Sequence, residues 1–213
     1  APLVLGCEVI LIPQFNAKKF DKLLEKYKPN ILFGVPTLFE ALTNTKNECL
    51  DLSMVKYVIS GGDSLSSSLE RRINVFLANH KAKCQISQGY GMTESLAAVA
   101  LAFGKANKPG SIGIPFPSNY IKIVKPRTQE EVPYGEDGEI CISGPTVMLG
   151  YLDNEKETNE MLQIHKDSLI WLHTGDMGMM DEDGVVFYRQ RKKRMIISSG
   201  YNIYTAHVEQ VIE

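Results

Sequence analysis

Cysteine, tryptophan and long apolar runs are scarce in this sequence of 213 residues. The four cysteines stand far apart, with no C-x-x-C pair and no histidine at metal-ligand spacing, and there is one tryptophan. This pattern argues against a disulfide framework or a structural zinc site, and favours reduced, buried cysteines and a cytoplasmic location. The longest clean apolar run, 96–103, is much shorter than the roughly 20 residues that a membrane-spanning helix needs.

The sequence also lacks a strong excess of charge. Its 23 basic and 25 acidic residues give a net charge of −2, which provides no argument for a nucleic acid or an anionic membrane as partner. The hydrophobic content of 44% is sufficient for a sizeable core in one large domain or two small ones. Because the sequence opens in an apolar run and stops inside an apparent helix, we expect it to be a piece of a longer protein.

Up to about residue 110, helical and strand periodicities alternate. Apolar residues have helical spacing after Asn16, a possible cap, as far as Pro29, and again after Pro36. Ser67 and Glu70 form a predicted capping box for a third helix. Short buried strands are predicted at 31–35 and 55–60. This alternation predicts an α/β fold, with parallel strands joined by right-handed crossovers in a βα subdomain at 1–110.

After residue 110 the pattern changes to short strands separated by turn sequences such as PYGEDG and DEDG. The strand-like runs are 120–124, 139–143, 185–189 and 195–198. One short helical stretch is predicted at 154–162. These features predict a smaller, antiparallel, β-rich subdomain at 111–193.

Two glycine-containing segments are placed where an open α/β sheet binds ligands, beyond the carboxyl ends of strands. SGGDSL, residues 60–65, follows a predicted strand, and QGYGMTES, residues 88–95, follows the apolar segment 84–86. We therefore expect both to be loops at one edge of the sheet.

The side chains of these two segments suit a nucleotide. Gly61 and Gly62 allow a ligand to lie against the main chain, because no Cβ keeps it away. Tyr90 can stack on a planar ring, Thr93 can bond an anionic oxygen, and Glu94 can hold Mg²⁺. Together these features describe a nucleotide site without a P-loop. Two tight turns, with Tyr90 half buried and Glu94 solvated, are the alternative interpretation.

A third segment, WLHTGDMG, contains a carboxylate suited to a sugar. Asp176 can accept hydrogen bonds from vicinal ribose hydroxyls, and Arg191 can add a charged donor on the same sugar or on the phosphate. His173 is a candidate for orienting this segment. The basic residues around Arg191 are equally compatible with a solvated strand end or a linker.

These motifs, in this order and at these separations, resemble the adenylate-forming superfamily of acyl-CoA synthetases, luciferases and peptide-synthetase adenylation domains. Further matching segments are VPTLFEAL at 35–42, KPGSIGIPFP at 108–117, GEICISGPTVMLGYL at 138–152 and the run R-x-K-x-x-I-x-x-x-G-Y-N-I that begins at Arg191. The resemblance covers nearly the whole chain. Each motif alone is weak, whereas five or more in register are specific.

The resemblance implies a role for each matching residue. Gly62, Asp63 and Ser64 match the loop on one side of adenine, and Tyr90 matches the aromatic residue on the other. Thr93 and Glu94 match the catalytic pair, with Glu94 as the Mg²⁺ ligand. The full set of implied nucleotide-binding positions is Gly62, Asp63, Ser64, Gly89, Tyr90, Gly91, Met92, Thr93, Asp176, Tyr188 and Arg191.

The chemistry implied by the resemblance has two steps and three substrates: a carboxylic acid, ATP and coenzyme A. The carboxylate attacks the α-phosphorus of ATP to give an acyl-adenylate and pyrophosphate. The thiol of coenzyme A then displaces AMP to form a thioester. The protein aligns the reactants and neutralises charge on the transferring group.

The resemblance also implies a hinge and the beginning of a small α+β C-terminal domain at 194–213. The matching hinge position is Arg194, where many members carry Asp and some carry Lys, and hinging needs a backbone that absorbs the change in φ and ψ. Gly200 and Tyr201 match the loop on the thiol side. The family's upstream phosphate loop and C-terminal lysine are missing from this sequence, so we expect this chain alone to have little or no adenylating activity.

Two other functions stay open. In a peptide-synthetase adenylation domain an aspartate in the segment that corresponds to 41–53 binds an amino group, and Asp51 lies there without a firm alignment. The apolar content around VPTLFEAL fits a fatty or aryl acid better. A nucleotide-binding module without catalysis is the third possibility, although such a module has no physical need to keep the metal carboxylate Glu94.

Overall fold

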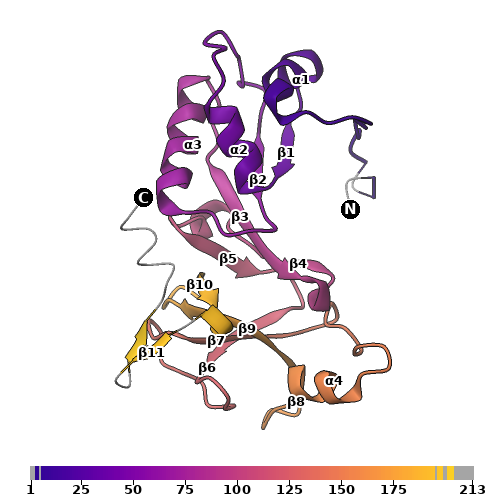
Figure 1. Ribbon diagram of the computed structural model, residues 1–213, viewed down its shortest axis with the longest axis vertical. Helices are drawn as coiled ribbons and strands as arrows, with labels where there is room; N and C mark the ends of the chain where they lie inside the picture. The colour runs from indigo at the N-terminus through magenta and orange to yellow at the C-terminus, as the bar shows by residue number, and fades with distance from the viewer. Residues whose placement is uncertain (1–2, 5, 195, 199–200, 204–213) are drawn as a thin grey trace.

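The computed structural model describes residues 3–4, 6–194, 196–198 and 201–203. Ten strands form one sheet, in which nine run in the order β1-β2-β3-β4-β5-β10-β9-β7-β6 and β8 pairs with β9. Figure 1 shows the βα part in its upper half and the β-rich part in its lower half. The predicted α/β fold, with a parallel part followed by an antiparallel part, is confirmed.

The βα part alternates as the periodicity predicts. Its strands are β1 (Ile31–Gly34), β2 (Tyr57–Ser60) and β3 (Ile86–Met92), and β2 is parallel to both neighbours. Its helices are α1 (Phe20–Tyr27), α2 (Pro36–Thr43) and α3 (Ser67–Asn79). Asn16 caps a 3-10 turn, η1 (Ala17–Lys19), immediately before α1. The predicted N-cap Ser67 is wrong by one residue, because the Ser66 hydroxyl accepts the Leu69 N–H.

One face of these strands forms an apolar core with the helices. Leu32, Val58 and Ile86 are adjacent in the register of β1, β2 and β3, and each is at most 5% exposed. Phe39 of α2 and Leu77 of α3 belong to the same buried cluster and are each 1% exposed. Burial of this side-chain layer provides the main favourable free energy of the βα part.

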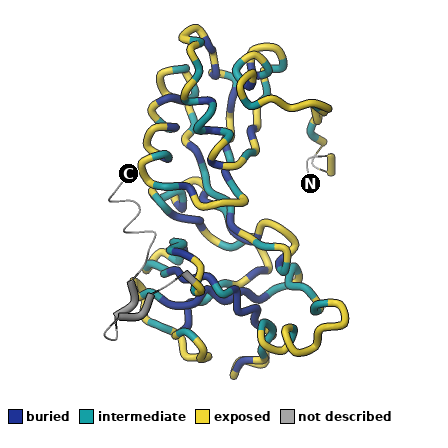
Figure 2. The backbone as a smooth tube through the Cα atoms, in the orientation of Figure 1, coloured by how far each residue is buried: buried dark blue, intermediate teal, exposed yellow. Residues whose placement is uncertain are grey.

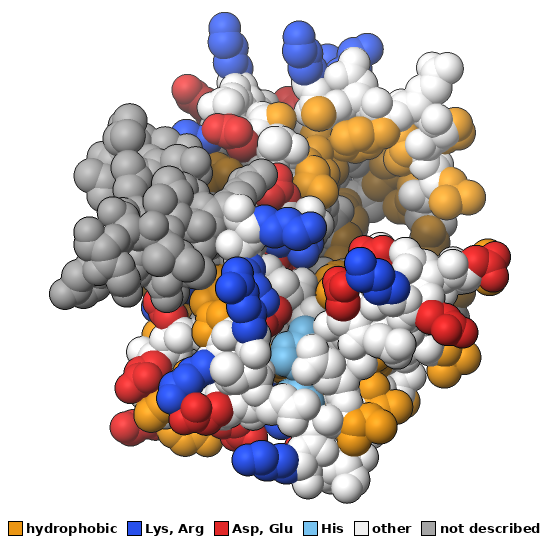
Figure 3. All heavy atoms as spheres, turned by 60° about the horizontal axis from the view of Figure 1, so that its bottom comes forward, with side chains coloured by type: hydrophobic (Ala, Val, Ile, Leu, Met, Phe, Trp, Pro, Cys, Tyr) orange, Lys and Arg blue, Asp and Glu red, His pale blue; other side chains and the backbone are white. Residues whose placement is uncertain are grey.

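The opposite face of the same strands is exposed in this chain. Ile31 and Phe33 alternate with the buried Leu32 and are 38% and 65% exposed, while Tyr57 contacts Phe103 at a ring separation of 5.9 Å. Figure 3 shows hydrophobic side chains gathered in the upper part of the face that it views. Among the described residues, β1 has β2 as its one partner strand.

The segment QGYGMTES differs from its prediction as a loop. Residues 88–92 belong to β3, which is parallel to β2 as far as Gln88 and then pairs antiparallel with β4 (Ala97–Leu101). A Cβ at Gly91 would lie 1.5 Å from the Ala97 carbonyl oxygen, so this glycine is required by the close approach of β4. Between the strands lies η2 (Thr93–Ser95). After β4 come η3 (Gly104–Ala106) and β5 (Ser111–Pro115).

The β-rich part contains the four predicted strands, with small differences in their bounds. It consists of β6 (Tyr120–Val124), β7 (Gly138–Ser143), α4 (Glu155–Met161), β8 (Leu162–Ile164), β9 (Ile170–Met180), β10 (Val186–Arg191) and η4 (Lys192–Arg194), followed by the hairpin of β11 (Ile196–Ser198) and β12 (Tyr201–Ile203). Buried residues follow β7 and β9 closely (Figure 2). The subdomain boundaries at 110 and 193 remain predictions.

No helix within the described residues is both long and apolar enough to cross a bilayer.

Candidate nucleotide site

A cavity of about 240 Å³ lies where β3, β9, β10 and the loop after β2 meet. Nine of the predicted nucleotide residues line it: Gly62, Asp63, Ser64, Gly89, Tyr90, Gly91, Asp176, Tyr188 and Arg191. Gln88 and Ile112 complete the lining and were missed by the sequence analysis. Met92, Thr93 and Glu94 do not line this cavity, although Met92 and Thr93 follow its wall directly in the chain.

Asp176 is the buried charge of the cavity. Its side chain is 3% exposed, and the Tyr90 hydroxyl donates a hydrogen bond of 2.7 Å to its Oδ2. Arg191, its partner across β9 and β10, forms an ion pair of 3.0 Å from Nε to Oδ1. Burial raises the pKa of Asp176, an effect that the Tyr90 hydrogen bond and the Arg191 charge oppose. The Asp176 carboxylate thus lines the cavity with two donors on it, the Tyr90 hydroxyl and the Arg191 guanidinium.

The loop after β2 brings main chain to the cavity. Gly62 has φ of +82°, a left-handed conformation in which a Cβ is strained. Asp63 and Ser64 are exposed, and the Asp63 carboxylate accepts the Ser64 N–H at 2.8 Å. These three residues line the cavity together with Tyr90, which is 9% exposed and whose ring lies 6.3 Å from the Tyr188 ring.

Thr93 and Glu94 lie in η2, at the turn between β3 and β4. Thr93 is exposed and Glu94 is half-buried. The Tyr151 hydroxyl donates to Glu94 Oε1 at 2.7 Å, and the Met148 N–H donates to the Glu94 carbonyl at 2.8 Å. A segment of the β-rich part therefore holds Glu94 at both its side chain and its main chain.

The backbone after η2 is strained. Leu96 and Ala97 both have positive φ, +54° and +77°, although neither is a glycine. Each such residue costs on the order of 1 kcal/mol, and strain of this kind gathers at functional sites.

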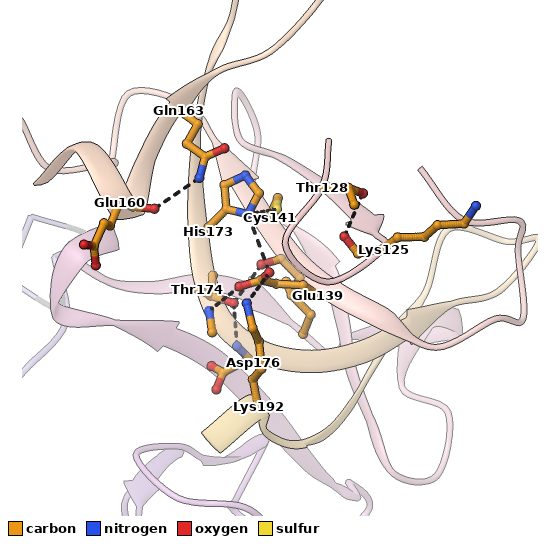
Figure 4. Close-up of polar contacts among 12 residues, drawn as sticks. Lys125, Thr128, Glu139, Cys141, Glu160, Gln163, His173, Thr174, Asp176 and Lys192 are labelled. Atoms are coloured by element: carbon orange, nitrogen blue, oxygen red, sulfur yellow. Dashed lines mark hydrogen bonds and ion pairs between the residues drawn. The ribbon is translucent and has the colours of Figure 1, made fainter. Parts of the chain in front are cut away.

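A second network of buried polar groups lies beside Asp176 in the β-rich part (Figure 4). Glu139 of β7 is 2% exposed and accepts hydrogen bonds from the Lys192 ammonium at 2.8 Å and from the Gly175 N–H at 3.1 Å. His173 Nδ1 lies 3.6 Å from the same carboxylate. Burial alone would raise the pKa of Glu139, but His173 and Lys192 together lower it to about 2.

Two further groups extend this network from His173. Its Nδ1 lies 3.5 Å from the Cys141 Sγ, and its Nε2 lies 2.9 Å from the His165 Nε2. Because one Nε2 has to donate and the other accept, the two imidazoles cannot both carry a proton there. Burial lowers the pKa of His165 and raises that of Cys141. That His173 orients the Asp176 segment remains a prediction.

Comparison with known proteins identifies the family of this chain. The family model described as "AMP-binding enzyme" matches residues 1–152. The chain belongs to the AMP-binding enzyme family.

Relatives within the AMP-binding family include two whose names state an acid and coenzyme A. A probable 4-coumarate–CoA ligase 1 of Dictyostelium discoideum is 40% identical over 210 residues, which are 97% of this chain and 36% of that protein. A long-chain-fatty-acid–CoA ligase of Bacillus subtilis (strain 168) is 37% identical over 211 residues, 98% of this chain and 36% of that protein. The chain thus spans little more than a third of these relatives.

Solved structures of similar proteins have the same fold. ATP-bound MatB from Rhodopseudomonas palustris has a TM-score of 0.81 at 27% identity, covering 95% of this chain and 38% of that one. A long-chain-fatty-acid–CoA ligase from Archaeoglobus fulgidus has a TM-score of 0.80 at 27% identity, covering 89% of this chain and 40% of that one.

Glu94 is the one carboxylate that the sequence predicts as a Mg²⁺ ligand in this chain. Within the part of the chain that the structure describes, no group of three His, Cys, Asp or Glu side chains gathers around a common point. Mg²⁺ in nucleotide enzymes is commonly held by one or two carboxylates together with substrate phosphates and water. The Glu94 carboxylate fits that donor set.

The three positions predicted for domain movement lie at the edge of the description or beyond it. Arg194 is the last residue of η4 and Tyr201 is the first residue of β12. Only the backbone of these two residues is described. Gly200 lies outside the described residues. Their roles in the hinge and the thiol-side loop remain predictions.

Proposed function

We propose that the protein containing this chain is an AMP-forming acyl-CoA synthetase for a fatty or aryl carboxylic acid. The observation that carries the proposal is the convergence of nine predicted nucleotide residues on one cavity. The CoA ligase names of the relatives support the thioester product and both classes of acid. Because the chain spans about 36% of these relatives, the activity is proposed for the whole protein.

In this proposal the adenosine part of ATP occupies the cavity. The base lies between Tyr90 and the main chain of Gly62, Asp63 and Ser64, with Gly89 and Gly91 around it. Tyr188 is proposed to line the ribose side. Asp176 exchanges the Tyr90 and Arg191 donors for ribose hydroxyls, and Arg191 then contacts the sugar or the phosphate. Because Met92 and Thr93 continue from the cavity wall in the chain, Thr93 is proposed to bond the α-phosphate.

Glu94 is proposed as the Mg²⁺ ligand, with Tyr151 fixing the carboxylate. Bound there, Mg²⁺ would neutralise charge on the phosphates of ATP. The acid attacks the α-phosphorus, pyrophosphate leaves, and coenzyme A then displaces AMP. A cytoplasmic location, consistent with the free thiols of the four cysteines, remains part of the proposal.

The test is acid-dependent ATP–pyrophosphate exchange by the full-length gene product, with fatty, aryl and amino acids as substrates. Asp176→Ala is expected to abolish exchange, whereas the exposed Glu182→Ala is the matched control and is expected to retain it. Exchange with amino acids alone would favour peptide-synthetase adenylation instead. No exchange with any acid, together with AMP binding that Asp176→Ala removes, would favour a non-catalytic nucleotide module.

This chain by itself is expected to bind AMP weakly and to catalyse little or no exchange, because the family's phosphate loop and C-terminal lysine are missing from it. Robust exchange by the chain alone would contradict that expectation.

A further inference from the structure

We propose that Glu139 is a positioning residue for the nucleotide site. Its carboxylate holds Asp176 in place through Gly175 and Arg191 in place through Lys192. The inference rests on the proposed function and gives a role to a buried carboxylate that the chemistry above does not use.

The contacts of Glu139 involve the chain neighbours of both site residues. Gly175, whose N–H donates to Oε1, immediately precedes Asp176. Lys192, whose ammonium donates to Oε2, immediately follows Arg191. A carboxylate that is 2% exposed is costly to bury unless it is paired and hydrogen-bonded, so its position is fixed by these partners.

The strand pairing is irregular at this point, which explains why a side chain has to supply the acceptor. The register of β7 with β9 shifts between Glu139 and Cys141, and Gly175 is left-handed with φ of +69°. Side chains replace ladder bonds here, because the Thr174 hydroxyl donates to the Ile140 carbonyl and accepts the Asp176 N–H. Glu139 thereby completes the turn of backbone that aims Asp176 at the cavity.

The second contact tethers the end of β10. The Arg191 side chain is 53% exposed and reaches Asp176 from the rim of the cavity. Lys192, at 28% exposure, ties the next residue back to β7. His173 Nδ1 lies 3.6 Å from Glu139 Oε2, the same carboxylate oxygen that accepts from Lys192. Loss of the Glu139 charge is therefore expected to loosen the Asp176–Arg191 pair and to weaken recognition of the ribose hydroxyls.

The experiment compares AMP with 2′,3′-dideoxy-AMP, which lacks the hydroxyls that Asp176 would bind. Affinities for both are measured by calorimetry on the full-length gene product, for wild type, Glu139→Gln, Lys192→Met and Lys192→Arg. Wild type is expected to prefer AMP. Glu139→Gln and Lys192→Met are expected to lower AMP affinity about tenfold, the scale of one charge-assisted hydrogen bond, with little change for the dideoxy nucleotide. Lys192→Arg keeps the charge and is expected to keep most of the preference.

Leu77→Ala is the control for a loss of stability. It removes apolar contacts in the βα core, far from Glu139 in the fold, so it is expected to lower the melting temperature and leave the AMP preference unchanged. A wild-type preference in Glu139→Gln and Lys192→Met would overturn the inference, as would an equal loss of both nucleotides. If Glu139→Gln fails to fold, Lys192→Met alone decides. Wild type without any preference would overturn the proposed function together with this inference.

Discussion

The two halves of the sheet are stabilised by different kinds of core. Among the described residues up to 110, three polar or charged residues are buried: Ser60, Glu70 and Ser95. From residue 111 onward the buried polar residues among those described are Ser111, Asn119, Glu139, Ser143, His165, His173, Thr174, Asp176 and Gln190. The βα part thus has an apolar interior, whereas the β-rich part places hydrogen-bonding groups inside.

This difference shows that two parts of one sheet can have different tasks, one providing stability and the other orienting side chains of the candidate site. In the βα part, apolar burial holds the strands while the main chain of the loop after β2 faces the cavity. In the β-rich part, polar groups that are costly to bury fix the direction of Asp176. Substitutions in the first core are expected to act on stability, and substitutions in the second on stability and binding together.

The largest expected effect is on the apolar core. Phe39→Ala is expected to lower the free energy of unfolding by about 3–5 kcal/mol, because it leaves a cavity at a side chain that is 1% exposed. Urea denaturation measures the change. The control Phe33→Ala, at a side chain 65% exposed, is expected to cost far less. Equal losses of unfolding free energy in the two variants would contradict the view that the buried apolar core stabilises the βα part.

The next effect is a dependence of stability on pH from Glu139. Its pKa of about 2 in the folded protein lies below the ordinary value of 4.5. The stabilisation is therefore present above pH 4.5 and is lost as the pH falls towards 2. His173, Lys192 and the Cys141 thiol face it, and the Asp176 carboxylate is close enough to interact with its charge.

The measurement is urea denaturation of wild type and Glu139→Gln at two acidic pH values. Between pH 5 and pH 3 wild type is expected to lose roughly 2 kcal/mol more than the variant, because all other carboxylates are shared. Parallel losses in the two proteins would show that the buried carboxylate is not what distinguishes the second core.

A smaller effect is expected where the two halves meet. Tyr151→Phe removes the donor to Glu94, the proposed Mg²⁺ ligand, and loss of a residue that orients a metal ligand typically weakens metal affinity by about tenfold or more. The Mg²⁺ concentration needed for half-maximal ATP binding by the full-length gene product is expected to rise accordingly. Tyr134→Phe, at a tyrosine 64% exposed, serves as the matched control. Superimposable Mg²⁺ titrations of Tyr151→Phe and wild type would show that Tyr151 has no role in Mg²⁺ binding.

The smallest effect is expected on the outer surface of the βα part. Arg72 and Glu40 form an ion pair of 2.7 Å with side chains that are 51% and 47% exposed. Arg72→Gln is expected to change the free energy of unfolding by less than about 0.5 kcal/mol, because solvent screens such pairs. A loss above about 1 kcal/mol in urea denaturation would mean that the scaffold depends on surface charge as well as on its core.

The sequence was informative where local pattern determines structure. Helical spacing located α1 to α3, a short helical stretch was predicted at α4, and the strand-like runs located β1, β2, β6, β7 and β10. The two glycine-containing segments, together with the family resemblance, predicted most of the cavity lining. Alternation failed at QGYGM because glycines interrupt the hydrophobic pattern of β3, and pairing with β4 decided its conformation instead.

The residues missed by sequence analysis act through contacts far apart in the chain. Tyr151 reaches Glu94 across 57 positions, and Lys192 reaches Glu139 across 53, separations over which no local periodicity carries information. Glu139 did leave a signal, because it is a charged residue within a strand whose six residues are all buried. Such a position requires buried partners, although the pattern does not say which residues they are.

The exposed face and unpaired edge of β1 have a practical meaning for work with this sequence. Ile31 and Phe33 are exposed on a strand that has β2 as its one partner within the described residues, and such an edge strand can template another strand. Purified by itself, the chain therefore carries a surface suited to self-association at high concentration.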